Sequence, residues 1–217
     1  ADSSFIRGME VVFVPVSNPD GFKYSTERER YWRKNRRYAT SPDCMGVDLN
    51  RNFEFAWSDS QEQVHSRFRK HPPPPRQCEE IYSGPKPASE PETQALQSLV
   101  REANLTVSID FHSCGGYILG PWSYTQEPHP RLEEILDLGG QLQDALGQSG
   151  MDYHFCTGNR CLYPVPGNLA DFGSSTGGLG FTVEMRPVVH EMVGMHDFAP
   201  PHDQILPSAE ENYQAVL

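Results

Sequence analysis

Short apolar runs alternate with helical patterns along this chain, and that alternation limits the folds open to it. The strand-like runs are residues 9–16, 105–111, 117–119 and 181–185. One helical pattern starts at Ser89, where Ser89 and Glu92 form a capping box, and others cover 131–146 and 208–217. We therefore expect an α/β fold with a mixed, largely parallel sheet and helices on both faces.

Residues 22–84 show little periodicity, which is unusual for so long a stretch inside one domain. A turn-like sequence, Asn-Pro-Asp-Gly at 18–21, precedes them. Long irregular segments of compact domains usually carry functional residues. The proline-rich segment 61–76 within this stretch is a candidate partner surface.

The charge balance excludes one class of partner. The 217 residues carry 18 Lys plus Arg against 29 Asp plus Glu, a net charge of -11, whereas nucleic-acid binding needs a basic face.

The length fits a single domain. No apolar run is long enough to span a bilayer. The first residues do not form a signal peptide, so in a secreted protein we expect that peptide to have been removed.

Two polar side chains stand near the ends of apolar strands. His112 follows the run 105–111, and Glu184 interrupts the run 181–185. Ligands of open α/β sheets bind at the carboxyl ends of strands, where we expect both residues. A buried carboxylate needs a partner or a function, so Glu184 is either paired with Arg186 or part of a site. His112 is either a hydrogen-bonded strand-end residue or a metal ligand.

A third candidate is the adjacent pair Asn50 and Arg51. Arginine offers a planar fork of donors that matches two carboxylate oxygens, and asparagine adds a neutral donor that fixes orientation. The pair could therefore hold a carboxylate. The alternative is a surface ion pair between Asp48 and Arg51 on a loop.

Nine short motifs or single residues follow one another in a definite order along the chain. They are VVFVPVSNPDG at 11–21, YWRKNR at 31–36, GVDLNRNF at 46–53, CEEIYSG at 78–84, SEPE at 89–92, SIDFHS at 108–113, Tyr163, Asp171 and FTVEMR at 181–186. In this order and spacing they resemble the zinc metallocarboxypeptidases, the family of the pancreatic carboxypeptidases A and B. The resemblance extends from about residue 9 to the C-terminus.

The resemblance implies a zinc-dependent exopeptidase that releases the C-terminal residue of a peptide. His112 would be the third zinc ligand, and Glu184 the general base that takes a proton from zinc-bound water and passes it to the leaving amine. Arg33 would polarise the scissile carbonyl and stabilise the oxyanion. The implied substrate-binding residues are Asn50 and Arg51 on the terminal carboxylate, Tyr163, which closes over it, and Ser113.

The resemblance also bears on the preferred substrate side chain. Relatives that remove Lys or Arg place an acidic residue immediately before the aspartate that matches Asp171. This chain has Ala170 there, which implies an apolar or aromatic C-terminal residue. The nearby Asn168 leaves room for a polar one.

The cysteines and one sequon bear on the compartment. The resemblance implies a disulfide between Cys44 and Cys78. Cys156 and Cys161 could form a second, local bridge, with Cys114 outside both pairs. Residues 104–106, Asn-Leu-Thr, form an N-glycosylation sequon. Together these features favour a secreted or otherwise extracytosolic glycoprotein.

The family takes its other two zinc ligands from an H-x-x-E motif before the turn at 18–21, and no H-x-x-E occurs in these 217 residues. A single imidazole cannot hold zinc. We therefore expect residues 1–217 to be the C-terminal two-thirds of one catalytic domain, completed by an N-terminal fragment or chain. Two alternatives stay open: a metal-free pseudoenzyme that binds peptide C-termini or a protein partner, and a cytosolic relative acting on glutamate-rich tails, against which the Cys44–Cys78 pairing speaks.

Overall fold

The computed structural model describes residues 10–39, 44–58, 76–157, 159–186, 198 and 200–216. Its α-helices are α1 (Pro19–Glu27), α3 (Pro91–Ala103), α4 (Leu132–Gly147), α5 (Leu169–Ser175) and α6 (Ile205–Val216). Its 3-10 helices are η2 (Leu49–Arg51), η3 (Arg76–Cys78) and η5 (His202–Gln204). Its strands are β1 (Val107–Ser113), β2 (Tyr117–Gly120), β3 (His154–Thr157) and β4 (Leu179–Met185).

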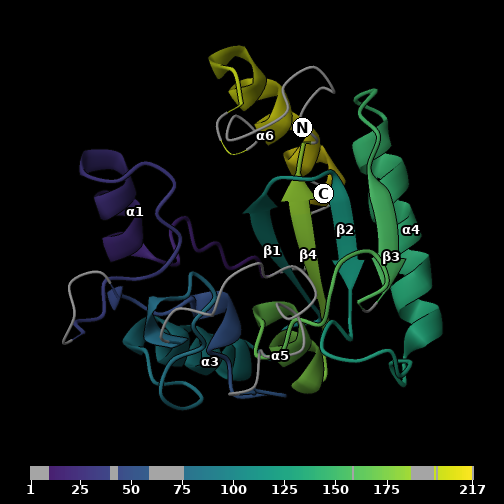
Figure 1. Cartoon of the computed structure of the whole chain (residues 1–217). Helices are drawn as coiled ribbons and strands as arrows, with labels where there is room; N and C mark the ends of the chain where they lie inside the picture. Colours follow the sequence, from purple (N-terminus) through teal and green to yellow (C-terminus); the bar gives the residue numbers. More distant parts are fainter. Residues whose placement is uncertain are drawn as a thin grey trace.

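The four strands form one sheet in the order β1-β4-β2-β3 (Figure 1). β1 is parallel to β4 and β2 is parallel to β3, whereas β2 and β4 are antiparallel. The predicted mixed, largely parallel sheet is therefore confirmed. Because β1 and β4 run in the same direction, their carboxyl ends lie at one edge of the sheet, at the top of Figure 1.

Helices cover both faces of β4. The main hydrophobic core joins one face of the sheet to α4, and its buried members include Leu179, Phe181, Val183, Ile118, Ile135, Leu142 and Leu146. Alternate residues of a strand point to opposite faces, so Gly180 and Glu184 face away from α4. Gly180 lies so close to Ala170 of α5 that a Cβ atom there would overlap the Ala170 backbone. Glu184 therefore belongs to the face that α5 covers.

A second, smaller core fixes the irregular segment at 44–58. Phe53 of that segment packs with Val100 of α3 and Phe172 of α5, and all three are almost fully buried. The rings of Phe53 and Phe172 have centroids 5.7 Å apart. Burying a side chain of this size contributes roughly 1.5–3 kcal/mol. The packing holds η2, just before Phe53, beside α3 and α5.

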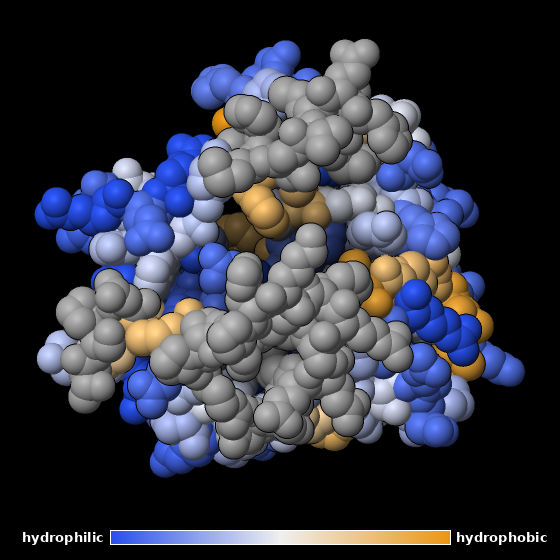
Figure 2. All heavy atoms as spheres, in the orientation of Figure 1, coloured by the Kyte–Doolittle hydropathy of each residue, from blue (hydrophilic) through white to orange (hydrophobic). Residues whose placement is uncertain are grey.

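The outer surface over α1 is polar. Figure 2 shows hydrophilic residues over this helix, and Lys23, Arg28 and Arg30 are exposed there. Across the described ranges, we find no helix long and apolar enough to cross a membrane.

The strand predicted for residues 9–16 is wrong over its described part. Residues 10–16 form no strand, and Val11 and Phe13 are 66% and 79% exposed. A strand requires a neighbour that accepts and donates its backbone hydrogen bonds. None of the four strands described pairs with this run, so its apolar composition alone does not make it a strand.

The predicted turn at 18–21 is instead the start of α1. The Asn18 side chain accepts a hydrogen bond of 3.0 Å from the Gly21 backbone N–H, and Pro19 occupies the first helical position. Asn, Pro, Asp and Gly favour helix N-termini as well as turns. Residues 18–21 are therefore compatible with either a turn or a helix N-terminus, and the predicted turn is wrong because a helix begins there.

The capping box predicted at Ser89 is also wrong. Glu90 is the N-cap of α3, and Pro91 is its first residue. Proline fits that position because its missing N–H has no partner in the first turn. The Ser89 hydroxyl instead donates to the Glu90 carboxylate at 2.7 Å.

The remaining predicted elements agree with the structure apart from their ends. β1, β2, β4, α4 and α6 match the expected strands and helices. β3 and α5 were not predicted, because runs of four and seven residues carry too little periodicity to be recognised. The candidate partner surface at 61–76 lies almost wholly outside the described residues.

Candidate active site

His112 and Glu184 lie side by side at the carboxyl ends of two adjacent parallel strands. They are paired in the register of β1 and β4, and neighbouring strands lie about 4.8 Å apart. Both side chains project from the face that α5 covers. Ser108 of β1 and Gly180 of β4 touch α5 on that same face. The strand ends therefore bring an imidazole and a carboxylate together.

The His112 ring is oriented by two neighbours. Its Nε2 atom lies 2.7 Å from Oδ2 of Asp110 and 3.2 Å from Nδ2 of Asn50. A histidine that donates its Nε2 hydrogen to a carboxylate keeps the lone pair of Nδ1 for another partner. Burial lowers the pKa of His112, but Asp110 outweighs it, so the pKa lies above its ordinary value.

Asn50 is held by backbone contacts on both sides of the site. Its Oδ1 atom accepts a hydrogen bond of 2.9 Å from the Leu169 backbone N–H, at the start of α5. Its own N–H donates to the Asp48 carboxylate at 3.1 Å, because Asp48 is the N-cap of η2. These bonds fix the side-chain amide of Asn50 beside His112.

Asp48 and two arginines form a charge cluster in the site, in which Asp48 and Arg51 are buried and Arg33 is exposed. Arg33 Nε donates to Asp48 Oδ2 at 2.9 Å, and Arg51 Nη1 lies 3.9 Å from the same oxygen. Asp48 and Arg51 are 3% and 4% exposed. Burial raises the pKa of Asp48, but Arg33 and Arg51 outweigh it and leave the pKa below its ordinary value. The alternative of a surface ion pair between Asp48 and Arg51 is therefore half right: the ion pair is present, but it is buried rather than on the surface.

Tyr163 lies over the buried guanidinium of Arg51. Arg51 Nη2 donates to the Tyr163 hydroxyl at a long 3.4 Å, while Arg51 Nη1 donates to the Asn50 carbonyl at 2.7 Å. Tyr163 is 42% exposed. An exposed phenol thus borders a buried cation, in a segment that follows the Cys156–Cys161 bridge.

Glu184 does not pair with Arg186, so that alternative is wrong. The Arg186 guanidinium instead binds the Glu211 carboxylate of α6 with two bonds, Nε to Oε1 at 2.9 Å and Nη2 to Oε2 at 2.8 Å. Within the described part of the chain, the Glu184 carboxylate forms no ion pair and accepts no hydrogen bond, while the Glu184 backbone carbonyl accepts one from the Gly116 N–H at 2.9 Å. Burial raises the pKa of Glu184 above its ordinary value, although His112 and Arg33 oppose that rise.

Asn168 and Ala170 lie at the start of α5, next to the site. Ala170 is 1% exposed. The Asn168 side chain caps α5 by accepting from the Asp171 N–H at 2.8 Å, and it donates to Val165 O and Asp171 Oδ2. Its hydrogen-bonding groups are thus used inside the protein, where Asn168 is almost fully buried.

Asp171 is buried, and hydrogen bonds stabilise its carboxylate; no cation among the residues with described positions pairs with it. Its carboxylate accepts from the backbone N–H groups of Ser123 and Tyr124 at 2.8–3.1 Å. Burial raises the pKa of Asp171 to about 6, against the lowering effect of these donors.

Ser113, which the sequence also predicts to contact the substrate, is exposed at the end of β1, opposite Met185 in the register.

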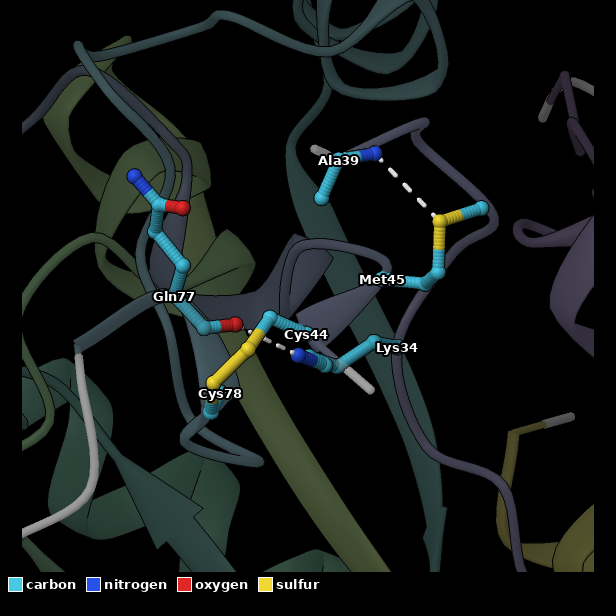
Figure 3. Close-up of a disulfide and its surroundings, with 6 residues drawn as sticks. All are labelled: Lys34, Ala39, Cys44, Met45, Gln77 and Cys78. Carbon is cyan, nitrogen blue, oxygen red and sulfur yellow. Dashed lines mark hydrogen bonds between the residues drawn. A yellow bond between two sulfur atoms is a disulfide. The ribbon is translucent and has the colours of Figure 1, made fainter. Parts of the chain in front are cut away.

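Two disulfides hold the loops around the site. Cys44 is bonded to Cys78 and Cys156 to Cys161, as the sequence predicted. Beside the first bridge, Lys34 Nζ donates to the Gln77 carbonyl at 3.0 Å (Figure 3). The bridge thus ties the segment that follows Arg33 to η3.

The donors present do not make a complete zinc site. His112 offers one imidazole, and no group of three His, Cys, Asp or Glu side chains suited to a metal exists among the residues with described positions. A tetrahedral catalytic site needs three protein donors. These residues therefore fit zinc only as part of a larger donor set.

Sequence reasoning missed the supporting carboxylates Asp110 and Asp48. Asp110 stands two residues before His112 in a strand, and residues at that spacing share a face, so the spacing could have revealed it. Asp48 was considered only as a partner of Arg51. Its closer contact with Arg33 joins positions 15 residues apart and has no local signal.

The fold and the site define a class of mixed α/β proteins in which an imidazole, an acid and an Asn–Arg pair meet at the carboxyl edge of parallel strands. Within that class the chain belongs to the zinc carboxypeptidase family, whose model matches residues 2–215.

Individual relatives agree with this assignment. The chain is 31% identical over 217 residues to carboxypeptidase O of Bos taurus, covering 98% of this chain and 53% of that protein. It is 30% identical over 209 residues to carboxypeptidase B of Astacus astacus, covering 94% and 64%. The chain thus spans about half the length of most curated relatives it matches.

Solved structures share the fold. Bovine thrombin-activatable fibrinolysis inhibitor, in complex with a tick carboxypeptidase inhibitor, superimposes with a TM-score of 0.78 at 31% identity, covering 93% of this chain and 65% of that one. A crystal structure of thrombin activatable fibrinolysis inhibitor gives 0.82 at 29% identity, covering 99% and 51%.

Proposed function

We propose that this protein is a zinc-dependent exopeptidase that releases the C-terminal residue of peptides. The observation that carries the proposal is the convergence of six side chains from five separate segments at one edge of the sheet. They are Arg33, Asn50, Arg51, His112, Tyr163 and Glu184. A protein without catalytic function has no chemical need for this combination.

The substrate carboxylate would bind at Asn50 and Arg51. Arg51 is a buried cation whose nearest carboxylate oxygen lies 3.9 Å away, so an incoming carboxylate would form a closer, charge-assisted pair. The long contact between Arg51 and the exposed Tyr163 hydroxyl can be exchanged for one with the substrate. Such binding selects for a free C-terminus.

Glu184 would carry the proton during hydrolysis. Its raised pKa makes it a stronger base than an ordinary glutamate, and no described partner competes for its oxygens. It would take a proton from the attacking water and transfer it to the amine that leaves. Arg33, within electrostatic range of Glu184, supplies positive charge for the oxyanion that develops on the carbonyl oxygen.

When bound, zinc supplies a Lewis acid that polarises the water and the scissile carbonyl. His112 would provide one donor, and Asp110 would hold its ring in place. We propose that the remaining donors belong to an H-x-x-E segment outside these 217 residues, on an N-terminal fragment or chain.

An apolar or aromatic C-terminal residue is the proposed preference. Ala170 presents no charge, and Asn168 and Asp171 direct their polar atoms into the α5 cap and the backbone of Ser123. A basic side chain would find no uncommitted carboxylate in this described part of the pocket. The two disulfides support secretion or another oxidising compartment.

A second candidate is a metal-free protein that binds peptide C-termini without cleaving them. The incomplete donor set favours it, and the Asn50–Arg51 pair would suffice for such binding.

The test is hydrolysis of blocked dipeptides ending in Phe, Leu or Arg by the purified protein, with zinc measured by elemental analysis. We expect one equivalent of zinc, release of Phe and Leu faster than Arg, and loss of release with a chelator. A C-terminal amide of the same dipeptide is the matched control and should not be cleaved. Binding of the free acid with neither zinc nor release would favour the second candidate instead.

A further inference from the structure

The N-glycosylation sequon at 104–106 occupies a distinct place in the fold. Asn104 is the C-cap of α3, and Thr106 is the last residue before β1. The other requirement, a central residue other than proline, is met by Leu105. In the whole sequence this is the only N-x-Ser or N-x-Thr with such a central residue. A modification there would therefore occur at one position per chain.

Asn104 is exposed and adopts a backbone conformation that suits asparagine. Its φ of 46° and ψ of 55° lie in the left-handed region, which asparagine tolerates better than most residues. Asn104 and Thr106 are exposed, while Leu105 between them is half-buried. None of the hydrogen bonds found in the described ranges uses the Asn104 side chain. A bulky group on the Asn104 amide would therefore break no described hydrogen bond.

The backbone next to the sequon is nevertheless firmly held. The Thr106 carbonyl accepts from the Leu179 N–H at 2.9 Å, which joins the start of β1 to the start of β4. Gly178 lies against the Leu105 carbonyl, where a Cβ atom would overlap it. The sequon thus marks the amino-terminal edge of the sheet and is fixed relative to it.

The sequon and the candidate active site lie at opposite edges of the sheet. β1 runs from Val107 to Ser113, and at about 3.3 Å per residue it separates the two edges by roughly 20 Å. His112 and Glu184 lie at the far end of β1 and β4, as Figure 1 shows for the two strands. A group at Asn104 would extend away from the substrate.

We propose that Asn104 carries an N-linked glycan, placed at the edge of the sheet where it leaves the active site open. The proposal is independent of the peptidase chemistry. It requires only passage through the secretory pathway, which the two disulfides support.

The test is to express the protein through the secretory pathway of animal cells and map its modification. Treatment with peptide-N-glycosidase should lower the mass and convert Asn104 to aspartate in the tryptic peptide. T106A should lose the glycan while Asn104 keeps its place as helix cap, and T106S, which preserves the sequon, should retain it. An unmodified Asn104 in the secreted protein, or a T106A protein that is still glycosylated, would refute the proposal.

The placement is tested separately on the same material. Removal of the glycan from the folded protein should leave the binding of a peptide C-terminus unchanged. A change of more than about twofold would contradict the assignment of the glycan to the edge remote from the site. Mass and binding are read without cleavage, so failure of the peptidase proposal would not be mistaken for failure of this one.

Discussion

Glu184 and Arg186 are two residues apart, yet they belong to two opposite kinds of polar cluster. The site cluster (Arg33, Asn50, Arg51, His112 and Glu184) includes a carboxylate without a described ion pair. The C-terminal clamp (Tyr153, Arg186 and Glu211) is fully paired: Arg186 binds Glu211 twice, and the Tyr153 hydroxyl donates to Glu211 at 2.8 Å and accepts from the Arg186 N–H at 2.9 Å.

We propose that the difference separates residues of the active site from residues that stabilise the fold. A buried pair whose hydrogen bonds are all made holds elements together, here β4 and α6, and has nothing left to offer a ligand. A buried carboxylate without a cation costs free energy and stays reactive. The raised pKa of Glu184 and that of Tyr153, raised by burial and by Glu211, thus have different settings: the first belongs to a carboxylate without a described ion pair, the second to a hydroxyl that both donates and accepts a hydrogen bond.

The largest effect is expected from Glu184→Gln. Loss of the base should reduce kcat/KM by about 10³-fold, while the melting temperature stays equal or rises because a half-buried charge is removed. Steady-state kinetics and thermal unfolding measure both. Retained activity in this variant would show that Glu184 belongs with the structural residues.

Glu211→Gln should have the reverse result. It leaves Arg186 without its carboxylate, and breaking a buried pair costs about 3 kcal/mol. Urea unfolding should show that loss, whereas kcat/KM per folded molecule should change little. A loss of activity at unchanged stability would instead place the clamp in the catalytic machinery.

Asp171 tests a third case, a carboxylate with hydrogen bonds but no cation partner in the part of the chain that the structure describes. Its pKa is raised from 3.8 to about 6, so between these values the folded state binds more protons than the unfolded state. Its contribution to stability should therefore fall, by about 2 kcal/mol, as pH rises from about 4 to about 6. Unfolding free energies of the parent and Asp171→Asn across this range measure it, and identical slopes would contradict it.

The smallest effect is expected from Arg51→Lys, which keeps the charge and loses the planar fork. A point charge in place of paired donors should raise KM about tenfold, near 1.4 kcal/mol, with kcat less affected. Arg37→Lys is a matched control, because Arg37 also pairs with a buried acid, Glu90, but away from the site. Equal effects of the two substitutions on KM would rule out a specific carboxylate contact at Arg51.

Local sequence predicted the parts of the fold that local physics decides. α4 and β4 are long and periodic, so their patterns identified them. The run 10–16 failed because a strand also needs a neighbour, and residues 18–21 failed because turns and helix caps favour the same residues. β3 and α5 are too short for any pattern to single them out.

The sequence by itself determined the family, the disulfide partners and the candidate chemistry, since these depend on residue types in a fixed order. Only the tertiary structure decided which charges meet. Arg186 pairs with Glu211 rather than with Glu184, Asp48 pairs with Arg33, and the Asn168 side chain caps α5. The physical reason is that an ion pair depends on distances of a few ångströms between residues far apart in the chain, which strand register and helix packing fix and local sequence does not.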